Sequence, residues 1–180
     1  MTIIIFLRKL HWDAVQYNLL GLVDAIGGQV FRKGFLERPV YHGNYQNTDF
    51  IINFSTEKAK KGRLYYMDIS LAKQFKNPAT ISSLPWLKER GESDKDFEPL
   101  KIFDDCRYGI RKNIGLNLIK DKNKAQFNDY IQQLDPFNFI YLSKNGMLFE
   151  KECKNIANET KHPLLKNILD SLFNLIKLIQ

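Results

Sequence analysis

The sequence predicts an α+β protein: a single domain over residues 1–180, with a mixed, split β-sheet flanked by helices. Strand-like and helix-like stretches alternate irregularly, unlike the regular alternation of a doubly wound parallel sheet. Asn145-Gly146 stands between two apolar runs, which is a strong hairpin signal. An apolar stripe at helical spacing over 164–179 predicts a C-terminal helix that packs on the core.

The first half of the chain supplies most of the expected strands. Residues 2–7 are β-branched and aromatic in succession, which predicts a strand. Asp13 is the expected N-cap of a helix that Gly27-Gly28 ends, because glycine adopts the left-handed C-terminal conformation at little cost. Further strands are predicted, with a short helix after them at 70–76; the strands are 40–42, 50–54 and 64–67.

The second half combines short helices with a final hairpin. Residues 89–98 are charged and contain glycine and serine, which predicts a mobile loop. Apolar residues at helical spacing predict a helix over 124–134, which Pro136 ends. The runs 139–142 and 147–149 are the expected strands of the hairpin around Asn145-Gly146.

Basic residues outnumber acidic ones by 27 to 20, which gives a net charge of +7. This balance favours an anionic partner: a nucleotide, DNA or RNA, or an anionic lipid surface. The densest basic cluster comprises Lys58, Lys60, Lys61 and Arg63. A solvated surface in a lysine-rich protein is the alternative interpretation of the same charge.

The apolar runs and the cysteines bear on the expected location. The longest apolar run lies at 3–7, far short of the roughly 18 residues that a membrane span needs, so no transmembrane segment is expected. Cys106 and Cys153 lack the spacing of a metal site, and no metal is expected. Two unpaired thiols suit a reducing compartment, which predicts a cytoplasmic protein.

Two motifs follow one another in the first half of the chain. The first is Tyr41-His42-Gly43-Asn44, and the second is Gly62-Arg63-Leu64-Tyr65-Tyr66. Their order resembles the His-Tyr-Glu branch of the ADP-ribosyltransferase superfamily, which includes bacterial toxins and the RNA 2′-phosphotransferases. The run at 139–148 is similar to the closing hairpin of the RNA 2′-phosphotransferases. The sequence departs from the family pattern at Asn44, where the family has threonine, and at Leu64, where it has glycine.

The resemblance implies an enzyme that uses NAD as co-substrate for ADP-ribosyl or RNA 2′-phospho transfer, as a toxin or effector acting on nucleic acid or protein. It implies that His42 and Gly43 hold the ribose and nicotinamide amide, and that Tyr65 or Tyr66 stacks on the nicotinamide ring. Glu150 or Glu152 is implied as the carboxylate that stabilises the developing positive charge. The segment 58–63, Arg63 included, is expected to face the pyrophosphate or a nucleic-acid acceptor.

Two alternatives from another functional class remain open. Residues 18–31, with their Gly27-Gly28 turn, also resemble the first helix and turn of BRCT modules, which implies a binder of phosphopeptides or DNA ends. Pro85-Trp86-Leu87 would then correspond to the closing helix of that module. The other alternative is a basic nucleic-acid-binding protein without catalysis.

Overall fold

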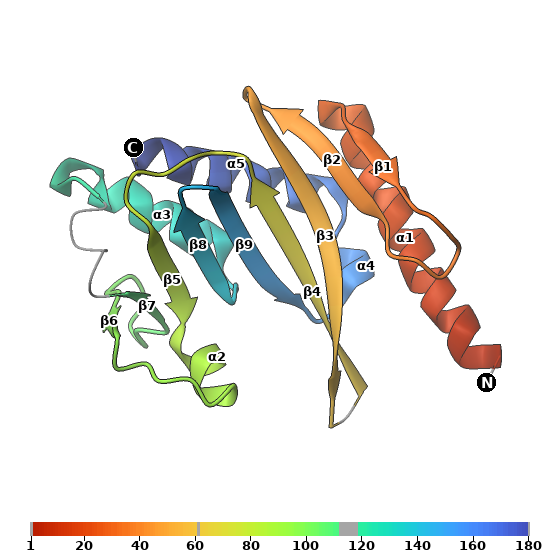
Figure 1. Ribbon diagram of the computed structural model, residues 1–180, viewed down its shortest axis with the longest axis horizontal. Helices are drawn as coiled ribbons and strands as arrows, with labels where there is room; N and C mark the ends of the chain where they lie inside the picture. The colour runs from red at the N-terminus through yellow and green to blue at the C-terminus, as the bar shows by residue number, and fades with distance from the viewer. Residues whose placement is uncertain (1, 61, 112–118, 180) are drawn as a thin grey trace. The chain divides into compact units, whose positions relative to one another are not determined.

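The computed structural model describes the backbone of residues 2–60, 62–111 and 119–179, and their side chains apart from those of 2–8 and 121. The chain forms two compact units, whose elements Figure 1 labels. Unit 1 comprises Met1–Leu71 and Glu152–Asn167, and unit 2 comprises Ala72–Lys151 and Ile168–Gln180. That the whole chain behaves as one domain stays a prediction.

Unit 1 is built from one long helix and consecutive antiparallel hairpins. Its strand order is β1-β2-β3-β4, and α4 (Ile156–Glu159) lies in its second segment. The long strands β3 and β4 pair along the whole of β4, from Phe50 opposite Leu71 to Ala59 opposite Gly62. The remaining elements are α1 (Thr2–Ile26), β1 (Gln29–Phe31), β2 (Val40–Tyr45), β3 (Thr48–Ala59) and β4 (Gly62–Leu71).

The helix α1 corrects the prediction of a strand at 2–7 with a helix starting at Asp13. The helix begins at Thr2, and Asp13 lies inside it, where its carboxylate accepts a hydrogen bond from Arg32 at 2.6 Å. An apolar run of five residues fits a helix as well as a strand, so composition did not decide between them. The predicted end at Gly27-Gly28 is confirmed, and both glycines have positive φ.

The core of unit 1 lies between α1 and one face of β2–β4. Trp12 is fully buried and contacts Phe54 with a ring separation of 6.0 Å. The Tyr41 hydroxyl donates to the Gly27 carbonyl, and burial raises the pKa of Tyr41 to about 12. The inward residues of the helix and strands are Trp12, Val15, Leu19, Leu22, Tyr41, Phe50, Ile52, Met67 and Ile69.

Unit 2 contains the second group of antiparallel strands, in the order β9-β8-β5-β7-β6. Its complete elements are β5 (Ala79–Ser83), α2 (Leu84–Glu89), β6 (Phe97–Pro99), β7 (Tyr108–Arg111), the 3₁₀ turn η1 (Asp121–Asn123), α3 (Lys124–Leu134) and β8 (Phe139–Ser143). Unit 2 also contains β9 (Gly146–Cys153) as far as Lys151 and α5 (His162–Leu178) from Ile168 onward. The α3 helix and the β8–β9 hairpin agree with the sequence prediction. Residues 70–76 do not form the predicted helix, because β4 continues through Leu71. The stripe expected at 164–179 is buried in α5 through Leu165, Leu169, Leu172 and Phe173.

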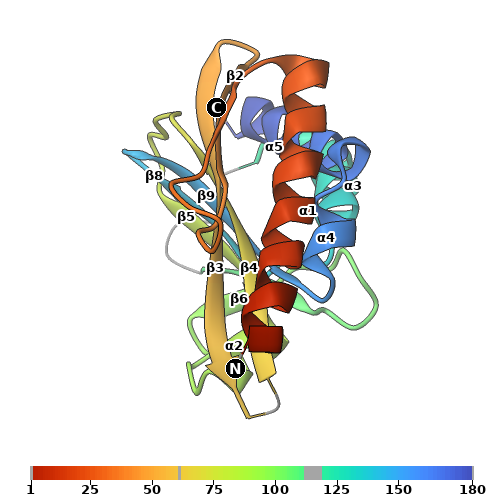
Figure 2. The same ribbon diagram turned by 90° about the vertical axis from the view of Figure 1, so that its right-hand side faces the viewer.

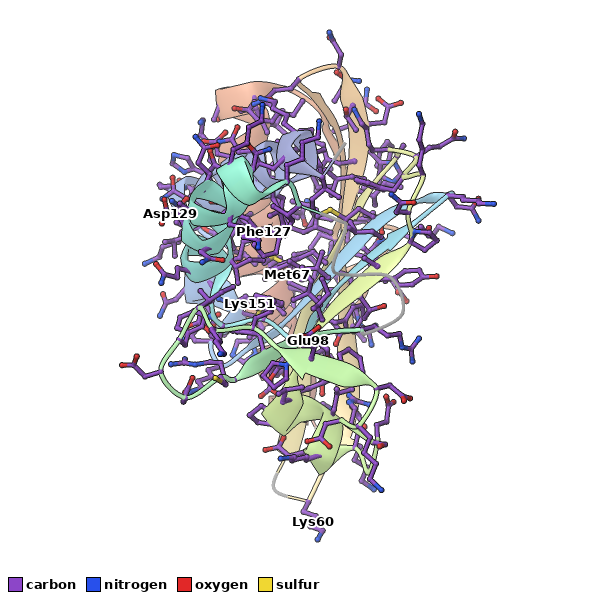
Figure 3. The ribbon with its side chains drawn as sticks, turned by 90° about the vertical axis from the view of Figure 1, so that its left-hand side faces the viewer. Lys60, Met67, Glu98, Phe127, Asp129 and Lys151 are labelled. Atoms are coloured by element: carbon purple, nitrogen blue, oxygen red, sulfur yellow. The ribbon has the colours of Figure 1, made fainter. Side chains whose placement is uncertain are left out.

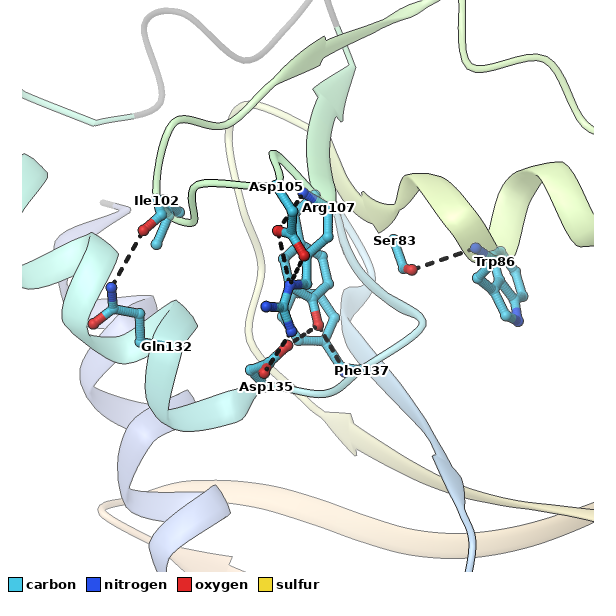
Figure 4. A network of polar contacts seen from close by, with 9 residues as sticks. Ser83, Trp86, Ile102, Asp105, Arg107, Gln132, Asp135 and Phe137 are labelled. Carbon is cyan, nitrogen blue, oxygen red and sulfur yellow. Dashed lines mark hydrogen bonds and ion pairs between the residues drawn. The ribbon is translucent and has the colours of Figure 1, made fainter.

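A polar network ties two segments of unit 2 together, as Figure 4 shows. The buried Tyr108 hydroxyl donates to Asp135 Oδ1 at 2.6 Å and accepts from the Phe137 backbone N–H at 3.1 Å. Arg107 Nη1 donates to Asp135 Oδ2 at 3.3 Å, and its Nε donates to Asp105 Oδ1 at 3.0 Å. The network therefore fixes the start of β7 against the segment that follows α3.

The α+β class predicted from the sequence is confirmed by these helices and strands. Every pairing described is antiparallel, in place of the expected mixed pairing. The physical reason is that hairpins join most neighbouring strands, whereas a parallel pair needs a long crossover connection. In the part of the chain that the structure describes, no helix has both the length and the apolar character to cross a membrane.

Candidate anionic-surface interface

His42 lies on β2 with its side chain exposed in an open hollow of about 550 Å³. Gly28, Asn44 and Asp49 line the same hollow, and Asn44 donates to Asp49 at 2.6 Å. The His42 ring meets Phe31 edge to face, with 5.1 Å between the ring centroids. This hollow could admit a small polar group. Gly28, at φ +97, has no Cβ atom and therefore leaves space beside the His42 carbonyl.

Tyr65 does not join His42. His42 pairs with Ile51 and Tyr65 pairs with Thr56, five residues further along β3. An odd separation puts the two side chains on opposite faces of the sheet, and five residues correspond to about 17 Å along the strand. The ring neighbours of Tyr65 are instead in α1: His11 at 6.0 Å and Trp12 at 5.9 Å.

Tyr66 and Gly43 have structural partners that explain them. Tyr66 shares the face of His42 by its strand register, but it is buried and its hydroxyl donates to Glu57 Oε2 at 3.0 Å. A Cβ atom at Gly43 would lie 2.6 Å from the Tyr41 ring and 2.7 Å from the Phe50 ring. Close aromatic packing therefore accounts for glycine at this position.

The two candidate glutamates belong to different units. Glu150, in unit 2, accepts a hydrogen bond from Asn138 Nδ2 at 2.8 Å. Glu152, in unit 1, is half-buried on β9.

Within unit 1, the strand register does not bring the predicted histidine, His42, and the predicted stacking tyrosine, Tyr65, into one cleft. NAD-dependent transfer stays a prediction. Among the described residues, no group of three or more His, Cys, Asp or Glu side chains could hold a metal ion.

The basic cluster of the sequence lies at the tip of the β3–β4 hairpin, which we call the hairpin tip (residues 58–63). Lys58 and Arg63 are directly opposite each other across the hairpin, and Lys60 lies in the turn, where Figure 3 labels it. All three side chains are exposed. Lys61 lies outside the described residues.

The three described cations of the hairpin tip have no ion pair or hydrogen-bonding partner for their charged groups among the described residues. Like charges directly opposite on a β-ribbon are destabilising by roughly 0.2–1 kcal/mol. Elsewhere in unit 1, Lys9 lies 3.6 Å and Arg32 2.6 Å from the Asp13 carboxylate. Lys33, Lys154 and Lys161 are exposed and, like the tip cations, have no ion pair among the described residues. The tip differs from these scattered cations because its charges lie together on one hairpin.

Arg38 supports the ribbon that leads to this tip. The pairing of β2 with β3 ends at Tyr41 opposite Ile52, so the outer edge of β3 has no strand partner in β2 beyond that pair. There Arg38 donates to the Phe54 carbonyl at 3.2 Å and to Thr56 Oγ1 at 2.9 Å. These bonds occupy backbone and side-chain acceptors that strand pairing leaves available.

The outer side of α1 combines exposed apolar and acidic residues. Leu10, Tyr17 and Leu20 are 46%, 78% and 46% exposed, and their spacing of seven and three residues puts them on one side of the helix. Asp13 and Asp24 share that side, because each is four residues from a member of this group. The buried residues of the helix, such as Trp12 and Leu19, occupy the other side. The helix therefore presents three apolar side chains outward beside two acidic ones.

The hairpin tip and the start of α1 lie at the same end of unit 1, as Figure 2 shows. Gly27 at the end of α1 meets Tyr41, which pairs with Ile52, whereas Trp12 meets Phe54. Moving toward the start of the helix therefore means moving along β3 toward the tip. The apolar run at 3–7 belongs to this first part of the helix.

Sequence reasoning found the cluster at 58–63 but missed its surroundings. The interpretation of 2–7 as a strand removed the first turns of α1 from consideration, although their backbone lies at the same end of unit 1 as the cations. The exposed side of α1 could have been found from Leu10, Tyr17 and Leu20, which repeat at helical spacing opposite the core positions.

Comparisons with known proteins give no family for the chain. No protein-family model matches it, and no curated protein matches it. Among solved structures, the mycobacterial trehalose monomycolate transport factor A is similar with a TM-score of 0.49 and 10% sequence identity. That alignment covers 93% of this chain and 97% of the transport factor. A likeness at this level carries no argument about function.

Proposed function

We propose that this chain is a non-catalytic module that docks on an anionic lipid surface through the hairpin tip and the exposed apolar residues of α1. The observation that carries the proposal is the group of cations Lys58, Lys60 and Arg63, which have no ion pair among the described residues and lie at the same end of unit 1 as the start of α1. Cations and apolar side chains together are what binding to the surface of an anionic membrane requires.

The electrostatic contribution is substantial by itself. Each Lys or Arg near an anionic membrane contributes about 1 kcal/mol, so the three described cations supply about 3 kcal/mol. At about 1.4 kcal/mol for each factor of ten, this is roughly a 100-fold increase in partitioning. The cations need not break existing ion pairs to make these contacts, because they have none among the described residues.

The apolar contribution comes from α1. Full burial of a large apolar side chain contributes about 1.5–3 kcal/mol, so half-exposed residues such as Leu10 and Leu20 add about 1 kcal/mol each. A single signal of this size gives only weak, reversible membrane binding, and stable attachment takes two. The proposal therefore requires both the tip and the helix.

The apolar segment favours a lipid surface over a nucleic acid as the partner. Nucleic-acid binding would use the cations of the tip but would give Leu10 and Leu20 no apolar environment.

The test is co-sedimentation of the full chain with vesicles of phosphatidylcholine, with or without phosphatidylserine. We expect binding only when phosphatidylserine is present, and loss of that binding in high salt. Reversing the tip charges in Lys58→Glu/Lys60→Glu/Arg63→Glu should weaken it at least about 100-fold. The matched control reverses three exposed cations elsewhere in unit 1, Lys33→Glu/Lys154→Glu/Lys161→Glu, and should retain most of the binding.

A second variant separates the lipid proposal from nucleic-acid binding. Tyr17→Gln/Leu20→Gln changes exposed residues of α1, so it should fold normally and weaken vesicle binding about tenfold. Binding to duplex DNA or single-stranded RNA should be weak and insensitive to this variant. Tight nucleic-acid binding that depends on the tip and ignores α1, without vesicle binding, would replace the lipid proposal.

A further inference from the structure

Unit 2 contains an apolar cleft that is independent of the proposed membrane interface. Its volume is about 300 Å³, and it lies among β6, the segment after β6, β7 and α3. Ile110 and Phe127 are buried and form its floor, while Leu100, Ile102 and Ile119 form its walls. Figure 3 labels Phe127 on α3 and Glu98 on β6.

The mouth of the cleft is positively charged on balance. Among the described residues that line it, Lys101 and Lys124 have exposed side chains, against one acidic residue, the half-buried Glu98. Lys124 is also the first residue of α3, and the 3₁₀ turn η1 leads directly into it through Asn123. The preceding Asn123 makes no side-chain capping bond there.

Hydrogen bonds hold the walls of the cleft on two sides. Gln132 Nε2 of α3 donates to the Ile102 carbonyl at 3.3 Å, as Figure 4 shows. The Leu100 backbone N–H donates to the Tyr108 carbonyl of β7 at 2.8 Å. The segment between β6 and β7 is thus tied to both neighbouring elements, which makes a preformed cleft with an apolar interior and few polar groups.

We propose that this cleft binds a small anionic amphiphile, with an apolar body in the cleft and a carboxylate at the lysines. The volume sets the size: at about 30 Å³ for the share of one water molecule in the liquid, 300 Å³ corresponds to about ten non-hydrogen atoms. Octanoate has this size and this chemistry. A carboxylate at Lys101 gains a favourable charge interaction that a neutral or cationic head group cannot make.

The experiment is an NMR titration of the full chain, labelled at isoleucine methyl groups, with octanoate. We expect saturable shifts at Ile102, Ile110 and Ile119, weaker binding of octan-1-ol, and no binding of octylammonium. Shifts confined to α1 residues, equal binding of octylammonium, or no shifts at these isoleucines up to the solubility limit would overturn the proposal.

Two variants test the charge and the space separately. Lys101→Glu should weaken octanoate binding about tenfold without affecting octan-1-ol, whereas Lys122→Glu, which is nearby but does not line the cleft, should change it less than about twofold. Asn128→Trp places a large ring at a lining position of α3 and should abolish binding of both ligands. Retained octanoate binding in Lys101→Glu would contradict the assigned carboxylate position even if Asn128→Trp fails to fold.

Discussion

The hairpin tip of unit 1 and the Arg107 network of unit 2 both contain basic side chains, but their charges are compensated very differently. Hydrogen bonding to Asp105 raises the pKa of Arg107, and Arg107 lowers the pKa of Asp105 in return. The guanidinium also lies 4.5 Å from the centre of the Phe103 ring. The tip has cations without such partners. The difference indicates that Arg107 serves the fold and that the tip is available to a ligand.

The largest effect on stability is expected from the network of unit 2. Tyr108→Phe removes the hydroxyl that donates to Asp135 and leaves the buried Phe137 N–H without its acceptor. We expect the free energy of unfolding to fall by about 2–3 kcal/mol, because an unsatisfied buried donor costs about 1–3 kcal/mol and the lost bond to a carboxylate is a strong one. Urea unfolding followed by circular dichroism measures it.

The comparison between the two regions supplies the control for this variant. Tyr141→Phe removes an exposed hydroxyl from β8 and should change stability by less than about 0.5 kcal/mol. Vesicle binding of Tyr108→Phe should equal that of the unmodified chain below the unfolding transition. A loss of vesicle binding without a loss of stability would mean that the network is not purely structural.

The next effect concerns the ribbon that holds the tip in place. Arg38→Met keeps the aliphatic stem of the side chain and removes the donors to the Phe54 carbonyl and Thr56. We expect a loss of about 1–2 kcal/mol in the free energy of unfolding and faster amide hydrogen exchange in β3 around residues 54–56. Exchange that accelerates equally throughout unit 1 would show that Arg38 does not act locally on the ribbon.

The fold was predictable where local signals were strong. Asn145-Gly146 fixes the β8–β9 hairpin by turn chemistry, and the spacing of Phe127, Ile131 and Leu134 identifies α3. The secondary-structure predictions were wrong where one amino-acid composition fits both a helix and a strand. The run at 3–7 is apolar in either conformation, so composition alone could not decide between a strand and the first turns of α1.

The candidate site was less predictable, because it depends on strand register. His42 and Tyr65 appear in a suggestive order in the sequence, but their side chains point to opposite faces through their pairing with Ile51 and Thr56. A one-residue change in register reverses the face of every side chain, so motif order alone could not settle this point. The cations of the tip needed only to be counted, and their lack of partners is visible only in the fold.

A smaller effect tests whether the tip is strained by its own charge. Lys58→Glu places an acidic residue opposite Arg63 and replaces repulsion by attraction across the ribbon. We expect the free energy of unfolding to rise by about 0.2–1 kcal/mol, and this gain should disappear in high salt. Vesicle binding should weaken at the same time. A variant that loses stability would mean that Lys58 has a favourable interaction in the folded state.

The smallest effect concerns Asp13, whose carboxylate compensates the charges of Arg32 and Lys9. The hydrogen bond from Arg32, followed by the charge of Lys9, lowers the pKa of Asp13 below its ordinary value of 3.8. A lowered carboxylate pKa stabilises the fold above the unfolded-state pKa, and that contribution is lost as the pH falls through the folded-state pKa. In Arg32→Met we expect the pKa of Asp13, measured from its carboxyl carbon shift, to return toward 3.8, and vesicle binding at neutral pH to stay unchanged. An unchanged pKa of Asp13 would show that Lys9 alone sets it. Weaker vesicle binding would mean that Arg32, a cation already partnered within the fold, also contacts lipid. The distinction between cations that are paired within the fold and cations that are not would then fail.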